Sequence, residues 1–152
     1  MENTKTLRAR AIIFKGDEIV AMYRERENRV FYSLPGGGAE GDETLEDCVK
    51  REVLEEFGII VEPIKQVYIY HNPRSIEYFY ICNWISGEFG SGNGEEFSPT
   101  QTNGVYKPTF IKINEIPNLP LMPPEVAVEL YADYKSNGES LTDTIKTLYR
   151  QD

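Results

Sequence analysis

The sequence predicts an α/β fold in which a mixed β-sheet packs against helices. Several short runs have the residue pattern of β-strands, most of them alternating and one apolar on both faces. A longer stretch, at about residues 44–57, has helical periodicity. The chain has 152 residues, of which 40% are hydrophobic and 12% aromatic, and we expect a single globular domain over residues 1–152.

The first strands are expected near the start of the chain. Leu7–Phe14 and Glu18–Tyr23 are β-like runs, and residues 15–17 between them are typical of a hairpin turn. A third short apolar run, Val30–Leu34, ends at a proline that three glycines follow. The helical stretch comes next and stops at Gly58, a good residue for a helix C-terminus.

Further strands and two helices are expected to complete the fold. Ile59–Tyr70 and Ile76–Ile85 are strand candidates, and the second is apolar on both faces, which indicates a central strand. Val105–Ile113 is another strand candidate. Pro123–Lys135 and Leu141–Tyr149 are predicted to be closing helices.

The charge balance limits the kinds of partner that the chain is expected to bind. It has 25 acidic and 16 basic side chains, a formal net charge of −9. This balance argues against a nucleic-acid partner, because phosphate backbones are held mainly by Lys and Arg. A small phosphorylated ligand is compatible with it, since a cation can bridge two negative groups.

The sequence carries no signal for export or for a membrane. The N-terminus lacks the apolar segment of a signal peptide, and no window approaches the roughly 18 apolar residues of a membrane span. We therefore expect a cytoplasmic protein without a membrane partner. Cys48 and Cys82 lie in periodic segments and are expected to be buried thiols, not a disulfide.

The stretch at residues 36–59 carries the most informative pattern. On a helix, a core-facing apolar row lies beside a row with two glutamates: Leu45, Val49, Val53 and Phe57 form the first, and Thr44, Cys48, Glu52 and Glu56 the second. Glu55 lies three residues after Glu52, and like charges at these spacings each destabilise a helix by roughly 0.2–0.5 kcal/mol. The pattern is explained by a bound cation or by a solvated acidic helix that follows a flexible turn.

The residue types favour one class of cation. Oxygen-only ligands suit a hard cation, Mg²⁺ or Mn²⁺, better than zinc, which prefers Cys or His. The three glycines at residues 36–38 permit close backbone approach, so a main-chain carbonyl is a further candidate ligand.

The spacing of this stretch matches a known motif. Five residues separate Gly37 from Glu43, seven separate Glu43 from Arg51, and residues 51–59 read Arg-Glu-Val-Leu-Glu-Glu-Phe-Gly-Ile. This is the Nudix box, Gly-x5-Glu-x7-Arg-Glu-U-x-Glu-Glu-x-Gly-U, in which U is a bulky aliphatic residue. With its box at residues 37–59, the chain resembles the Nudix hydrolases, and among them the small single-domain MutT-type members.

The resemblance implies a Nudix-type α/β/α sandwich and a role for each matching residue. The positions that match the family's metal ligands are Glu52, Glu55, Glu56 and, through its carbonyl oxygen, Gly36. Arg51 and Glu43 match positions that usually pair with each other and orient the glutamates. The implied chemistry is attack on phosphorus by a water molecule that a metal ion activates.

The general base has two candidates under this resemblance. Glu52 could serve, but some family members use a glutamate from a later loop. Here the loop at residues 87–104 carries Glu95 and Glu96. We favour Glu96, because its distance from the box resembles that of the MutT-type members.

Substrate contacts are expected from four residues. Arg24 follows the second strand, near where small Nudix enzymes often hold phosphate, although its neighbours make a self-neutralised turn an alternative. Tyr32 could stack on a base or belong to the core. Gly37 and Gly38 allow the backbone to approach a substrate closely.

Taken with these residues, the resemblance predicts metal-dependent hydrolysis of the pyrophosphate linkage in a nucleoside diphosphate derivative. The short format favours a nucleoside triphosphate, and an ADP-ribose or nucleotide-sugar pyrophosphatase is the alternative. A different class of function is a non-catalytic Nudix-fold sensor that binds a nucleotide, and the intact box favours catalysis over it. We expect a nucleotide as the small-molecule substrate and a monomer or homodimer as the assembly.

Overall fold

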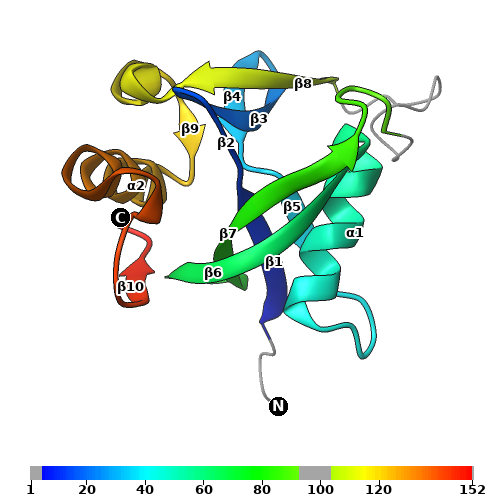
Figure 1. Ribbon diagram of the computed structural model, residues 1–152, viewed down its shortest axis with the longest axis horizontal. Helices are drawn as coiled ribbons and strands as arrows, with labels where there is room; N and C mark the ends of the chain where they lie inside the picture. Colours follow the sequence, from blue (N-terminus) through cyan, green and yellow to red (C-terminus); the bar gives the residue numbers. More distant parts are fainter. Residues whose placement is uncertain (1–4, 93–103, 152) are drawn as a thin grey trace.

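The computed structural model describes residues 5–92 and 104–151. Two β-sheets and two α-helices make up most of it (Figure 1). The elements in chain order are β1 (Thr6–Ile12), β2 (Phe14–Lys15), β3 (Glu18–Arg26), β4 (Arg29–Ser33), β5 (Gly36–Gly38), α1 (Leu45–Phe57), β6 (Ile59–His71), β7 (Ser75–Gly87), β8 (Val105–Lys112), the 3₁₀ helix η2 (Ile113–Asn118), β9 (Leu121–Met122), α2 (Pro124–Asn137), the 3₁₀ helix η3 (Gly138–Ser140) and β10 (Lys146–Tyr149).

The larger part of the fold is a mixed sheet with the order β10-β6-β7-β1-β5. Strands β1 and β7 are parallel, as are β10 and β6, whereas β6–β7 and β1–β5 are antiparallel. The predicted central strand, β7, does lie in the middle of this sheet. A mixed sheet was expected, and this expectation is confirmed.

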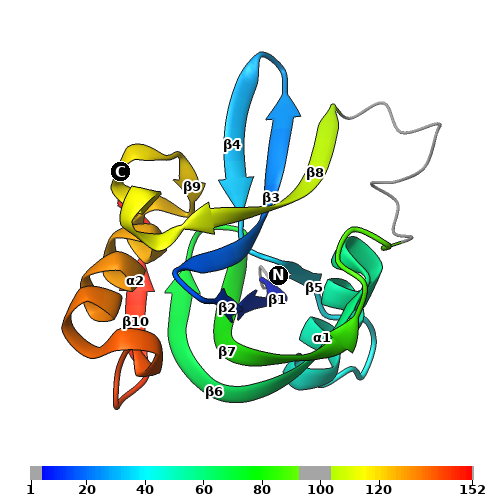
Figure 2. The same cartoon turned by 45° about the horizontal axis from the view of Figure 1, so that its top comes forward.

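A second sheet stands beside the first. It has the order β2-β3-β4-β9, and β8 pairs with the other edge of β3. Figure 2 shows β4, β3 and β8 side by side, and the curved strands β6 and β7 lie below them in this view. The short hairpin between β2 and β3 confirms the turn predicted at residues 15–17, where Gly16 has a φ of +62°.

Helix α1 begins and ends where the sequence indicates. The hydroxyl oxygen of Thr44 accepts a hydrogen bond from the backbone N–H of Asp47 at 3.1 Å, which satisfies one of the unpaired donors of the first turn. Gly58 has a φ of +77° and ends the helix in the left-handed conformation. The helix therefore matches the prediction for residues 44–57.

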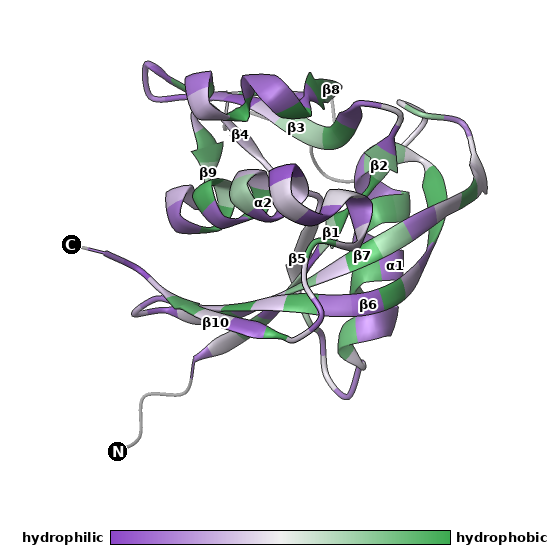
Figure 3. Ribbon diagram, turned by 60° about the vertical axis from the view of Figure 1, so that its left-hand side comes forward, coloured by the Kyte–Doolittle hydropathy of each residue, from purple (hydrophilic) through white to green (hydrophobic). Residues whose placement is uncertain are grey.

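The two helices cover opposite faces of the mixed sheet, as an α/β/α sandwich requires. The buried residues of α1 pack with one face of β7, including Tyr80 and Cys82. Those of α2 pack with the other face, including Phe79 and Ile81. This alternation follows from the two-residue period of a strand. In Figure 3 both helices carry green and purple turns, as helices with one buried face do.

The predicted C-terminal helix at Leu141–Tyr149 is wrong. Residues Lys146–Tyr149 form strand β10, which pairs in parallel with Tyr68–His71 of β6. Leu141 has a φ of +57°, which a right-handed helix does not permit. The unpaired backbone of β6 offers hydrogen bonds to this segment, and such long-range pairing outweighs the weak helical spacing of its apolar residues.

Two smaller expectations concern the membrane and the cysteines. Cys48 and Cys82 are buried free thiols, as expected. Within the described part of the chain, neither helix has the length and apolarity that crossing a bilayer demands.

Candidate active site

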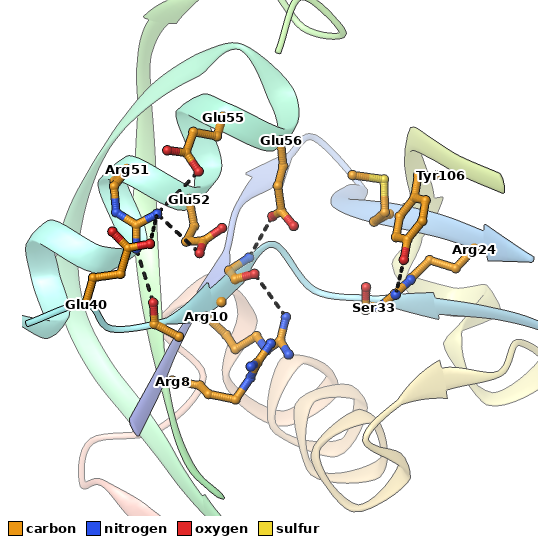
Figure 4. A pocket seen from close by; sticks show the side chains of 14 residues that line it. Arg8, Arg10, Arg24, Ser33, Glu40, Arg51, Glu52, Glu55, Glu56 and Tyr106 are labelled. Carbon is orange, nitrogen blue, oxygen red and sulfur yellow. Dashed lines mark hydrogen bonds and ion pairs between the residues drawn. The ribbon is translucent and has the colours of Figure 1, made fainter. Parts of the chain in front are cut away.

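A cavity of about 360 Å³ lies where α1, β5, β1 and β3 meet (Figure 4). Charged side chains and glycine backbone form most of its wall. The lining residues are Arg8, Arg10, Met22, Arg24, Ser33, Gly36, Gly37, Gly38, Glu40, Arg51, Glu52, Glu55, Glu56 and Tyr106. Most of the residues singled out in the sequence lie in this lining, namely Gly36, Gly37, Gly38, Glu52, Glu55, Glu56, Arg24 and Arg51. Arg8 and Arg10 were not singled out, and Glu43 does not line the cavity.

At two of the three glycines of strand β5, Gly36 and Gly37, a side chain does not fit. A Cβ atom at Gly37 would collide with the carboxylate of Glu52, and one at Gly36 would collide with the backbone carbonyl of Ala9. Gly36 also has a φ of +142°, which L side chains rarely adopt. Its backbone N–H donates to Oε1 of Glu56 at 3.0 Å. The glycines therefore let α1 bring two carboxylates against the backbone of β5.

Arg51 is bound by the carboxylates around it. Its Nε and Nη2 donate to the two carboxylate oxygens of Glu43, at 2.7 and 3.0 Å. Its Nη1 lies 3.4 Å from Glu52 and 3.3 Å from Glu55. The hydrogen bond from Arg51 lowers the pKa of Glu43, and the same bond raises the pKa of Arg51. The expected pairing of Arg51 with Glu43 is thus present.

The glutamates of α1 offer the right donor atoms for a hard cation but are oriented toward other partners. Glu52 and Glu55 reach toward Arg51, and Glu56 accepts from Gly36. Within residues 5–92 and 104–151, no three His, Cys, Asp or Glu side chains are grouped so as to hold a metal ion. The oxygen-only donor set in one cavity fits Mg²⁺ or Mn²⁺ chemically, and the side chains would have to turn toward a shared ion.

Two arginines of β1 line the same cavity. Arg8 and Arg10 project from one face of the strand, while Ala9 and Ala11 on the other face are buried in the core. Arg10 forms an ion pair with Glu77 at 3.0 Å and donates to the carbonyl oxygen of Gly36 at 3.3 Å. The alternation of Arg and Ala at residues 8–11 is a signal that sequence reasoning missed.

Arg24 enters the cavity from β3 and is held by aromatic rings. Its Nη2 donates to the hydroxyl of Tyr106 at 2.7 Å, and its guanidinium carbon lies 4.6 Å from the centre of that ring. Its Nε is buried and has no hydrogen-bond partner in the described ranges. Burying a charged hydrogen-bond donor without a partner costs free energy, so a ligand that accepts a hydrogen bond from this Nε would gain affinity. Tyr106 comes from β8, and no sequence signal indicates its place here.

Of the predicted substrate contacts other than Arg24, the two glycines lie in the cavity and Tyr32 does not. Gly37 and Gly38 line the cavity. Tyr32 lies outside it, partly buried against the core, with its ring edge-on to Tyr23 at 5.5 Å. The predicted substrate contact of Tyr32 is therefore not found. Side chains alternate along β4, so its neighbour Ser33 lines the cavity instead. Glu95 and Glu96 lie outside the described residues.

Comparison with known proteins agrees with this fold. The NUDIX domain family matches residues 4–131. The chain is 35% identical over 95 residues to the NAD-capped RNA hydrolase NudC of Vibrio parahaemolyticus serotype O3:K6, covering 60% of this chain and 35% of that protein. It is 29% identical over 117 residues to an ADP-ribose pyrophosphatase of Methanocaldococcus jannaschii, covering 71% and 62%.

Among solved structures, the crystal structure of an ADP-ribose pyrophosphatase from Streptococcus suis 89-1591 has a TM-score of 0.63 and 28% sequence identity. The match covers 97% of this chain and 100% of that one. The chain spans between about a third and two thirds of the length of the two curated relatives.

The chain belongs to the NUDIX domain family. The predicted family and fold are thereby confirmed, and the relatives' names, hydrolase and pyrophosphatase, support a Nudix hydrolase enzyme. Nudix hydrolases generally use a divalent metal ion.

Proposed function

We propose that the chain hydrolyses the pyrophosphate linkage of a nucleoside diphosphate derivative, with Mg²⁺ or Mn²⁺ as cofactor. The observation that carries this proposal is the division of one cavity into an acidic wall and a basic wall. Glutamates from α1 form the first, and arginines from β1 and β3 form the second. A pyrophosphate with a divalent cation on one side and guanidinium groups on the other has this charge distribution.

The acidic wall would hold the cation. Glu52, Glu55, Glu56 and the carbonyl oxygen of Gly36 are the proposed ligands, all of which line the cavity. When bound, a divalent cation lowers the pKa of a bound water and neutralises charge on the phosphoryl oxygens. Glu52 would take the proton from the attacking water, or Glu96 would do so from the later loop.

Arg51 is proposed to act as a positioning residue. It spans Glu43 on one side and Glu52 and Glu55 on the other, so it fixes the direction of two proposed ligands. Arg24 would bind a phosphoryl oxygen, because its buried Nε lacks a partner among the described residues. Contacts in and beside the cavity support both proposed roles.

Two substrate classes are supported by different observations. The MutT-type format favours a nucleoside triphosphate, as the sequence predicts. Two relatives carry the name ADP-ribose pyrophosphatase, and this favours ADP-ribose. Both substrates contain the linkage that the cavity is proposed to bind, and they differ in the group beyond it.

A panel of nucleotides tests the proposal. The purified chain would be incubated with nucleoside triphosphates, ADP-ribose, nucleotide sugars and dinucleoside polyphosphates, with and without Mg²⁺. We expect cleavage only with the cation, and products that each retain a phosphoryl group. Reaction in ¹⁸O-labelled water, followed by mass spectrometry of both products, would identify the phosphorus that is attacked.

Two results would contradict the proposal. Release of orthophosphate alone from a triphosphate, with the diphosphate left over, is not pyrophosphohydrolysis. Absence of cleavage for the whole panel, with nucleotide binding retained, would instead support the non-catalytic sensor.

A further inference from the structure

Arg8 and Arg10 belong to the basic wall of the cavity, but the proposed function gives neither of them a role of its own. Arg8 lies on β1 opposite Gly38 in the pairing register, whereas Arg10 lies opposite Gly36. The side chain of Arg8 is half-buried and lines the cavity, and Figure 4 shows it extending from β1 toward β5. It is therefore part of the basic wall and is accessible to a ligand.

Each of the other arginines of the cavity has a side chain as its hydrogen-bond or ion-pair partner, and Arg8 differs from them in this respect. Arg10 pairs with Glu77, Arg24 donates to Tyr106, and Arg51 pairs with Glu43. In the described chain Arg8 makes no hydrogen bond or ion pair of this kind, although the carboxylates of Glu77, Glu52 and Glu56 attract it from a greater distance. Arg8 thus has five N–H donors to offer to a ligand.

The surroundings of Arg8 make a bound anion favourable. Burial and the positive charge of Arg10 lower the pKa of Arg8 by more than the carboxylates of Glu77, Glu52 and Glu56 raise it, so the net effect disfavours its charged form. The guanidinium group remains charged nonetheless, because the ordinary pKa of arginine is far above neutrality. A negatively charged ligand group would offset the repulsion from Arg10 and accept hydrogen bonds from the guanidinium group of Arg8.

The position of Arg8 separates it from the part of the basic wall that Arg24 occupies. Arg10 donates to the carbonyl oxygen of Leu34 and borders, together with Arg24, an adjoining cavity. Arg8 does not border that cavity, and its Cα lies two residues, or about 7 Å, further along β1. A chain of anionic groups could therefore contact Arg24 at one end and Arg8 at the other.

We propose that Arg8 binds an anionic substrate group beyond the two phosphoryl groups of the cleaved linkage, and so selects nucleoside triphosphates over conjugates that end in a neutral sugar. This inference rests on the proposed function and names its substrate class. Arg8 is a specificity-determining residue in this proposal, since the glutamates and Arg24 remain available to the linkage itself.

Binding of two inorganic probes tests the role of Arg8 without turnover. Imidodiphosphate and diimidotriphosphate differ by one phosphoryl group, and nitrogen replaces their bridging oxygens. Isothermal titration with Mg²⁺ would compare wild type with Arg8→Ala, Arg8→Lys and Arg74→Ala, the last at an exposed arginine outside the cavity. The probes lack a base, so the unknown base preference does not enter.

We expect wild type to bind diimidotriphosphate more tightly than imidodiphosphate. Arg8→Ala should weaken the triphosphate probe about 10-fold or more and the diphosphate probe less than about 2-fold, because it removes a charged hydrogen bond to one group only. Arg8→Lys should recover part of the loss, and Arg74→Ala should behave like wild type. Circular dichroism would establish that the variants are folded.

The proposal is overturned if wild type binds both probes equally, or neither at millimolar concentration, or if Arg8→Ala weakens both by the same factor. These outcomes are independent of the hydrolysis panel. A chain that hydrolyses nothing but keeps the Arg8-dependent preference would contradict the proposed function and leave the anion site standing. A chain that hydrolyses ADP-ribose but shows no such preference would support the proposed function and overturn the anion site at Arg8.

Discussion

The guanidinium group of Arg51 binds both carboxylate oxygens of Glu43, with Nε 2.7 Å from Oε2 and Nη2 3.0 Å from Oε1. This two-bond geometry fixes the plane of the guanidinium group. The third nitrogen, Nη1, is thereby directed at Glu52 and Glu55. One ion pair therefore positions two of the proposed metal ligands, although Glu43 itself is not a proposed ligand.

Replacing Arg51 with alanine should weaken metal binding and turnover together. Without the guanidinium group, Glu52 and Glu55 lose a shared partner. Loss of a residue that orients metal ligands typically reduces metal affinity about 10–100-fold. Titration with Mn²⁺ and steady-state kinetics would measure the two effects. Lys50→Ala is the matched control, because Lys50 is a neighbouring helix residue with a half-exposed ion pair to Glu62. Unchanged metal affinity with collapsed turnover would mean that Arg51 acts on the substrate directly.

The contribution of Glu43 to stability should disappear in acid. Its pKa is lowered in the folded chain, chiefly by the hydrogen bond from Arg51, from an ordinary value of 4.5. The unfolded state therefore binds more protons at acid pH, and the stabilisation is present above the ordinary pKa and lost as pH falls through the folded value. The free energy of unfolding of wild type should exceed that of Glu43→Gln above the ordinary pKa of 4.5, and the gap should close as pH falls through the lowered pKa of the folded chain. A gap independent of pH in urea titrations would contradict this.

Glu52→Gln and Glu56→Gln should each lower turnover by about 100-fold or more while the fold survives. The carboxylates repel one another, so removing one charge leaves the free energy of unfolding unchanged or slightly higher. Glu46→Gln, at an exposed position on the same helix, should retain turnover. Kinetics and thermal denaturation would be measured for all three variants. Near-normal turnover in the first two, or loss of the fold, would argue against the metal site.

Lys146→Met should destabilise the fold by about 1–3 kcal/mol, because it removes the charged donor of a buried carboxylate. Lys146 Nζ lies 2.7 Å from Asp133, which is only 6% exposed and also accepts from the hydroxyl of Tyr68. Lys112→Met is the control, since Lys112 pairs with Asp17 on the surface at 3.5 Å. That variant should change stability by less than about 0.5 kcal/mol. Equal losses of unfolding free energy for the two variants, measured by guanidinium denaturation, would show that Lys146 does not stabilise the buried carboxylate of Asp133.

The acidic wall of the cavity could be predicted from sequence because helix geometry is local. Residues three and four apart share a helix face, so the spacing of Glu52, Glu55 and Glu56 places them together wherever the helix lies. Gly58 marks the end of the helix for an equally local reason, its left-handed conformation. The glycines before the helix also indicated a close backbone approach, which Gly37 makes to Glu52.

The basic wall depended on strand pairing, which local sequence does not specify. Arg24 meets Tyr106 only because β3 and β8 pair in a particular register, 82 residues apart. Arg8 faces the cavity because β5 pairs with β1 opposite Gly38. In the same way, Lys146 lies in a strand and not a helix because the edge of β6 supplies its hydrogen bonds. A strand gains its partners from distant segments, so its role is decided when the tertiary structure brings those segments together.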